Sequence, residues 1–304
     1  MSGLHPLAPG SHLVTVENVP QAYHVAGRGP ICIAHPGGPG ADWGYMRMPL
    51  LEERMTMVYL EPIGTGASGT LPEHPKGYTI DRYSLQLHGL LTTLDLSNVF
   101  LLGHSHGGFV AQEYALAHPE RLAGLILYAT AAVTGPEFMQ AADVAIRRSV
   151  ANDHDAVRGA AVLNAWQAVP ATSDDASYTD TMRGLLPAYF ADPDRAAGPM
   201  KSLSEALRFS FVQGDARPFD VREALSTLTV PTLIMVGEHD FICGPRCAEP
   251  LRDALPDATL ARFPGSGHFI HIEQAAEFAG AVYSFVEQHG HLPAFAEGSI
   301  NAGR

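Results

Sequence analysis

The chain has 304 residues, of which 46% are hydrophobic and 17% charged, and its formal net charge is −13. This much apolar material is enough for a large buried core and excludes an intrinsically disordered chain. The acidic balance, with no local cluster of Lys or Arg to offset it, argues against nucleic-acid binding, because a polyanion would be repelled.

Short apolar runs typical of strands alternate with runs of helical spacing along most of the chain. Helices are expected at 84–94, at 246–255, at 272–287 and in a segment that ends at Ala117. Continuous apolar strands separated by helices predict an α/β fold with a mainly parallel sheet covered on both faces. The expected strands are 13–16, 22–25, 31–34, 57–60, 99–102, 122–128, 232–236 and 259–263.

Residues 133–215 depart from this alternation of strands and helices, because they contain Ala-rich helical runs at 137–150 and 156–168 and no convincing strand. Pro136 stands at a favoured first-turn position of the first run. We therefore predict an inserted helical cap, or lid, between two strands of the sheet. The expected domain organisation is 1–132 for the first part of the core, 133–215 for the cap and 216–304 for the second part of the core.

The chain contains no unbroken run of 18 apolar residues, and its first residues lack the pattern of a signal peptide. Three cysteines, Cys32, Cys243 and Cys247, cannot all pair within one chain, and no nearby His or second Cys pair completes a metal site. We expect free thiols, no metal, no membrane association and a cytoplasmic protein.

The strongest chemical motif is Gly103-His104-Ser105-His106-Gly107, which stands between a predicted strand and a predicted helix. Such a turn holds a serine hydroxyl clear of the sheet, and small residues two positions before and after it relieve crowding. Ser105 is therefore the predicted nucleophile. The side chains of His104 and His106 are expected to point away from it.

A serine nucleophile needs a hole that binds the oxyanion of the tetrahedral intermediate. One donor is expected to be the amide of His106, which follows the nucleophile, and the other an amide of the glycine-rich loop after the third strand. In that loop Gly38 is the first choice and Gly37 the second, because glycine lets the backbone approach the intermediate closely.

The hydroxyl also needs a base, and the base needs an acid that orients it. Asp240 follows a predicted strand end, and His268 follows the last strand. This gives the chain order Ser, Asp, His that accompanies a serine on such a strand-to-helix turn. Glu238 is the alternative acid, and His271 is a weaker alternative base.

Four motifs together carry a family resemblance, which covers about residues 20–130 and 225–285. They are His35-Pro36-Gly37-Gly38-Pro39-Gly40, Gly103-His104-Ser105-His106-Gly107-Gly108, Gly237-Glu238-His239-Asp240 and Gly265-Ser266-Gly267-His268. With these motifs the chain resembles the α/β-hydrolase superfamily, and its Gly-Gly-Pro-Gly turn resembles the proline iminopeptidase group. The resemblance implies an eight-stranded sheet, a helical cap, a Ser-His-Asp triad and no cofactor.

Two segments depart from that group. Its members usually carry Asp-x-Arg-Gly-x-Gly-x-Ser after strand four, where this chain reads Glu61-Pro62-Ile63-Gly64-Thr65-Gly66-Ala67-Ser68. Proline iminopeptidases also carry Trp-x-x-Trp-Glu in the cap, and its Glu holds the substrate ammonium. The nearest match here begins at Trp166 and lacks that Glu. Most acidic residues of the cap are expected to be solvated, and Glu205, on a mainly apolar run, is the best candidate among them for an inward-facing carboxylate. Trp166 and Glu205 are the candidate substrate-binding residues.

We therefore predict a serine hydrolase of the proline iminopeptidase-like type that cleaves a small (amino)acyl amide, from a small molecule or short peptide, through an acyl-enzyme. The alternative is a carboxylesterase or lactonase of the same fold. A binding module without catalysis is a third hypothesis, which an intact triad opposes. The oligomeric state stays open.

Overall fold

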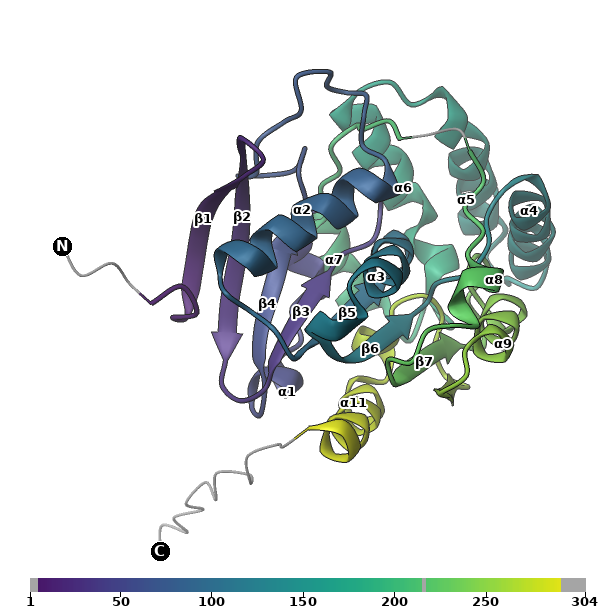
Figure 1. Cartoon of the computed structure of the whole chain (residues 1–304). Helices are drawn as coiled ribbons and strands as arrows, with labels where there is room; N and C mark the ends of the chain where they lie inside the picture. Colours follow the sequence, from purple (N-terminus) through teal and green to yellow (C-terminus); the bar gives the residue numbers. More distant parts are fainter. Residues whose placement is uncertain (1–4, 215–216, 291–304) are drawn as a thin grey trace, which may run out of the picture.

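The computed structural model describes residues 5–214 and 217–290. Its centre is an eight-stranded sheet with the order β1-β2-β4-β3-β5-β6-β7-β8 (Figure 1). Strand β2 is antiparallel to both β1 and β4, and all other neighbours are parallel, which confirms the predicted mainly parallel sheet. The strands are β1 (Gly10–Val16), β2 (Val19–Gly27), β3 (Ile31–His35), β4 (Thr56–Glu61), β5 (Val99–His104), β6 (Leu122–Tyr128), β7 (Thr232–Gly237) and β8 (Ala258–Phe263).

Helices cover both faces of the sheet, as the continuous apolar strands require. On one face the buried core joins the strands to Leu87, Tyr114 and Leu251 of three helices, and on the other it joins them to Leu51 and Phe278 of two more. The first group is α2 (Ile80–Thr93), α3 (His106–Ala117) and α9 (Pro245–Ala254), with the short α8 (Arg222–Leu225) beside them, and the second is α1 (Pro49–Glu52) and α11 (Ala275–His289). No helix in the described part of the chain is long and apolar enough to cross a bilayer.

Short helical turns complete the connections. They are η1 (Trp43–Met46), η2 (Pro119–Arg121), η3 (Val169–Ala171) and α10 (Ile270–Glu273).

A group of helices is inserted between β6 and β7, and two of them, α4 (Pro136–Ala151) and α5 (Ala156–Ala168), lie at the right of Figure 1. Ile146, Val162 and Leu185 from these helices share a buried cluster with Phe241 and Phe269 from loops of the core. The predicted helical runs at 137–150 and 156–168 are both present. The predicted end of the insertion, at 215, lies outside the described residues. The other helices of the group are α6 (Asp175–Tyr189) and α7 (Ala197–Ala206).

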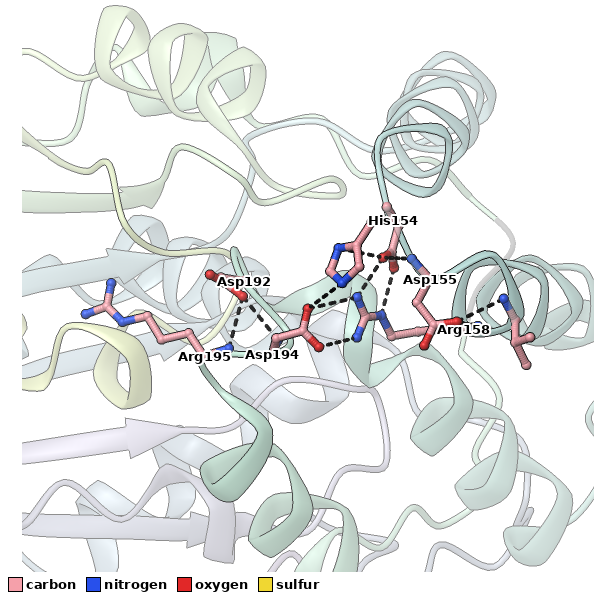
Figure 2. A network of polar contacts seen from close by, with 8 residues as sticks. His154, Asp155, Arg158, Asp192, Asp194 and Arg195 are labelled. Carbon is pink, nitrogen blue, oxygen red and sulfur yellow. Dashed lines mark hydrogen bonds and ion pairs between the residues drawn. The ribbon is translucent and has the colours of Figure 1, made fainter.

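Arg158, on the first turn of α5, ties this group of helices together (Figure 2). Its guanidinium donates to Asp153 over 2.6 and 2.8 Å, and to Asp194, in the loop between α6 and α7, over 2.7 and 3.2 Å. The hydrogen bonds from Arg158 lower the pKa of Asp153 to about 2. A planar guanidinium that donates two hydrogen bonds to each of two carboxylates fixes their orientation as well as their distance from it. The start of α5 is therefore held against the α6–α7 loop.

Candidate active site

Ser105 occupies a strained turn between β5 and α3. Its backbone angles are φ 52° and ψ −119°, a combination that a non-glycine residue adopts at a cost in energy. The turn is held because the N–H of Ser105 donates to the carbonyl of Tyr128 over 3.1 Å, and its own carbonyl accepts from Thr130 Oγ1 over 2.8 Å. The strand–turn–helix geometry is that of a nucleophile elbow.

Glycines on both sides make this turn possible. A Cβ added at Gly107 would overlap the carbonyl oxygen of His35 on the neighbouring strand. A Cβ added at Gly103 would lie 2.7 Å from the Cα of Gly108. The two positions predicted from the motif to need small residues are thus crowded by backbone, which cannot move aside.

The side chains of His268 and Asp240 form a buried pair, with Nδ1 of His268 2.7 Å from Oδ2 of Asp240. The other oxygen of Asp240 accepts the N–H groups of Ile242 and Cys243 over 2.9 and 3.0 Å. Burial by itself would raise the pKa of Asp240, but the charge and hydrogen bond of His268, together with the two backbone N–H groups, lower it. The carboxylate is therefore ionised.

An ionised carboxylate only accepts hydrogen bonds, so Nδ1 of His268 must carry a proton, and Nε2 is the ring nitrogen that can accept one. Ser105 and His268 line the same pocket. Within the described residues no hydrogen bond joins the Ser105 hydroxyl to this imidazole. In active sites without substrate, such bonds are often long and shorten when substrate binds. The arrangement can take a proton from a hydroxyl that moves toward Nε2.

The two rival residues have other partners. Glu238 is bonded to Arg262 over 2.9 Å near the surface. Both ring nitrogens of His271 are engaged, Nδ1 with the Tyr128 hydroxyl over 2.7 Å and Nε2 with the Tyr45 carbonyl over 2.9 Å. Neither residue is placed to serve beside Ser105.

The three predicted oxyanion donors differ in their surroundings. The amide of Gly37 already donates to the Tyr45 hydroxyl over 2.6 Å. Gly38 has φ 121°, a conformation that side chains rarely adopt, and an added Cβ would lie 2.7 Å from the amide nitrogen of Gly40. His106 begins α3, where helix N–H groups are unpaired and carry partial positive charge. The Gly37 amide is thus already engaged, and Gly38 and His106 stay the candidate donors.

The pocket around Ser105 is narrow, about 50 Å³, and mostly apolar. It lies between the core and the inserted helices, because residues from both line it. No Asp or Glu stands among the described residues that line it. These are Gly37, Gly38, Ala41, Tyr45, His104, Ser105, Met182, Leu186, Tyr189, Leu207, Phe209, His268 and Phe269.

Comparison with known proteins agrees with the fold. Residues 30–275 match the alpha/beta hydrolase fold family. The chain belongs to that family. A proline iminopeptidase from Lactobacillus helveticus (strain DPC 4571) is 27% identical over 282 residues, which cover 86% of this chain and 90% of that protein.

Two solved structures share the fold at lower identity. An alpha/beta fold family hydrolase from Bacillus anthracis str. Sterne is 19% identical with a TM-score of 0.70, over 90% of this chain and 98% of that one. An enol-lactonase from Burkholderia xenovorans LB400 is 21% identical with a TM-score of 0.67, over 91% of this chain and 100% of that one.

The two residues predicted to bind substrate in this hydrolase lie elsewhere. The side chain of Glu205 is 69% exposed and lies 4.0 Å from Lys201 on the same helix, so the prediction of an inward-facing carboxylate is wrong. Two residues along a helix are separated by about 200°, so Glu205 faces away from the buried Leu203. Trp166 packs edge-on against Phe241 and donates to Asp143 over 3.0 Å, outside the pocket lining.

Several residues that line the pocket of the hydrolase were not predicted from the sequence to lie there. His104 was expected to point away from Ser105, yet it lines the pocket, stacks on Tyr128 and contacts the carbonyl of His268. Tyr45 and Tyr189 also line the pocket and carry no motif. Only its place beside Ser105 in the elbow motif could have singled out His104.

Proposed function

We propose that this protein is a serine hydrolase in which Ser105 is the nucleophile, His268 the general base and Asp240 the acid that orients it. One observation supports this proposal above the others. Ser105, on its strained turn, lines the same pocket as the imidazole of His268, whose Nδ1 is bonded to Asp240 over 2.7 Å. The fixed tautomer leaves Nε2 as the proton acceptor, as a general base requires.

In the first half of the reaction the Ser105 oxygen bonds to the substrate carbonyl carbon, and its proton passes to Nε2 of His268. The amides of Gly38 and His106 stabilise the negative oxygen that results. The bond to the leaving group then breaks, and His268 returns the proton to that group. An acyl-enzyme ester on Ser105 remains.

In the second half water attacks the acyl carbon while His268 takes a proton from it. The ester bond to Ser105 then breaks, the carboxylic acid leaves, and the serine oxygen regains its proton from His268.

For the substrate, we propose an amide or ester with a small acyl group, the acyl side occupying the apolar pocket beneath the inserted helices. The 27% identity to a proline iminopeptidase supports an aminoacyl amide. The lining by Leu186, Leu207 and Phe209, with no carboxylate among the described residues beside them, supports the alternative of an uncharged ester or lactone. A buried ammonium would need a partner charge that this lining lacks.

Two experiments test these proposals. A fluorophosphonate probe should add one phosphonyl group to the wild-type protein at Ser105, detected by intact mass and peptide mapping, and none to Ser105→Ala. Failure to label, or labelling at another residue, would overturn the assignment of Ser105 as the nucleophile.

Turnover of aminoacyl anilides, of the same anilides acetylated at nitrogen and of simple esters then separates the substrate classes. An aminopeptidase requires at least about a tenfold preference for the free amine, equal to about 1.4 kcal/mol of transition-state binding.

A further inference from the structure

A chain of hydrogen bonds runs from the oxyanion loop to the loop of His268, passing beside Ser105. The N–H of Gly37 donates to the Tyr45 hydroxyl over 2.6 Å, and that hydroxyl lies 2.6 Å from Nδ1 of His104. Nε2 of His104 lies 3.2 Å from the carbonyl oxygen of His268. A Cβ added at Gly37 would lie 3.1 Å from both the Cβ of Ser105 and the Tyr45 hydroxyl, so the chain and the nucleophile are close neighbours.

The direction of every bond in this chain is fixed by chemistry. A carbonyl oxygen only accepts, so Nε2 of His104 must carry a proton. Burial, with the neighbouring His268 and His271 rings adding to it, holds the pKa of His104 well below its usual value, so the ring is neutral and has one proton. Nδ1 is therefore an acceptor, and the Tyr45 hydroxyl must donate to it while accepting from Gly37.

The backbone of Tyr45 is held as firmly as its hydroxyl. Its carbonyl accepts from Nε2 of His271 over 2.9 Å, and the Tyr128 hydroxyl in turn lies 2.7 Å from Nδ1 of His271. The ring of His104 stacks on that of Tyr128, with centroids 4.3 Å apart. Tyr45 is therefore fixed from two sides by buried imidazoles, and it can transmit a position from one loop to the other.

We infer that Tyr45 and His104 are positioning residues, which hold the oxyanion loop and His268 at a fixed separation around Ser105. The inference rests on the proposed function, because only a reaction at Ser105 needs both loops at once. Gly37 precedes Gly38, so the bond to Tyr45 sets where the Gly38 amide points. Oxyanion binding and proton transfer both depend on placement to well within an ångström.

The first test is Tyr45→Phe, which removes the hydroxyl and keeps the ring. The measurement is phosphonylation by a fluorophosphonate, in which the Ser105 oxygen bonds to phosphorus, fluoride leaves and His268 takes the serine proton. We expect the limiting rate of labelling to fall by about 10- to 100-fold, less than the loss of an oxyanion donor, with half-saturating probe concentration changed less than about twofold.

Tyr59→Phe is the matched control. The Tyr59 hydroxyl is also buried, accepts the N–H of Met48 over 2.9 Å and donates to Glu52 over 2.8 Å, but it has no contact with the pocket. We expect this variant to lose comparable stability in urea unfolding and to label at close to the wild-type rate. Equal labelling rates in the two variants would overturn the inference.

A second pair of variants tests the chain at its centre. Glutamine offers an acceptor oxygen and a donor NH2 group where the neutral imidazole offers one acceptor and one donor nitrogen, whereas leucine offers neither. We expect His104→Gln to label at least about fivefold faster than His104→Leu, as partial restoration of one positioning contact implies. Equal rates would overturn the inference even if Tyr45→Phe failed to fold. Wild-type protein that does not label at Ser105 would instead overturn the proposed function itself.

Discussion

The backbone N–H of His268 donates to the carbonyl oxygen of Tyr189 over 2.7 Å, and the two rings lie 5.0 Å apart. Tyr189 is the last residue of α6, so an inserted helix holds the loop of the proposed base directly. Glu273 adds a second connection, because its carboxylate accepts the N–H of Gly267 and the N–H of Ala191, both over 2.7 Å. A movement of α6 is therefore transmitted to His268.

Glu273 also makes stability depend on pH. Burial raises its pKa from 4.5 to about 7 in the folded protein, against the lowering effect of its two backbone hydrogen bonds. The folded state therefore binds a proton more tightly than the unfolded state, so the stability linked to Glu273 is full below pH 4.5 and is lost as the pH rises to about 7. Glu273→Gln should flatten urea-unfolding stability across this window, on the order of 1 kcal/mol after allowance for solvent screening. Glu277→Gln, at an exposed position of α11, should leave the profile unchanged. A wild-type slope of the opposite sign would contradict the expectation.

Asp240→Asn should keep the fold and lose about 10⁴-fold in turnover, because the amide favours the wrong imidazole tautomer. Glu238→Gln is the control, since Glu238 pairs with Arg262 instead. Steady-state rates on p-nitrophenyl acetate measure both. A larger loss for Glu238→Gln would reverse the assignment of the acid.

Gly107→Ala should destabilise the protein by more than about 3 kcal/mol, because the new methyl group meets the backbone carbonyl of His35 and overpacking cannot be relieved there. Gly280→Ala on α11 is the matched control. A Cβ there meets nothing within 4 Å, so alanine should stabilise the helix by about 0.5–1 kcal/mol. Urea unfolding gives both values, and equal effects would show that the elbow is not crowded.

Leu186→Ala should widen the pocket beside Ser105. We expect the ratio of p-nitrophenyl butyrate to acetate turnover to rise by about tenfold, the usual worth of a methylene or two in an apolar pocket. Glu205→Gln should leave that ratio unchanged, because the side chain of Glu205 is 69% exposed. A shift in the Glu205 variant alone would place substrate on the outer face of α7.

The elbow could be predicted from the sequence because its determinants are local. Residues 99–102 are apolar and buried as β5 requires, and Gly103 and Gly107 are spaced as the crowded turn demands. The pairing of Asp240 with His268 followed from chain order, since both stand at ends of parallel strands that meet at one edge of the sheet.

Residues that act across the fold could not be predicted in this way. His104 is 59 residues from Tyr45 and 164 from His268 along the chain, and no periodic pattern links positions so distant. The prediction for Glu205 failed for a different reason. An apolar neighbourhood in sequence does not say how a helix is rotated, and α7 turns Leu203 inward.

Burial keeps four of the histidines around Ser105 uncharged over a wide range of pH. It lowers the pKa of His35 and His271 to about 4 and that of His106 to about 3, and that of His104 falls as well. Through mildly acidic and neutral solution these four rings thus add no positive field that would oppose a proton arriving at a neighbouring imidazole. The four rings stay uncharged, and of the five imidazoles named here it is His268 that is bonded to a carboxylate.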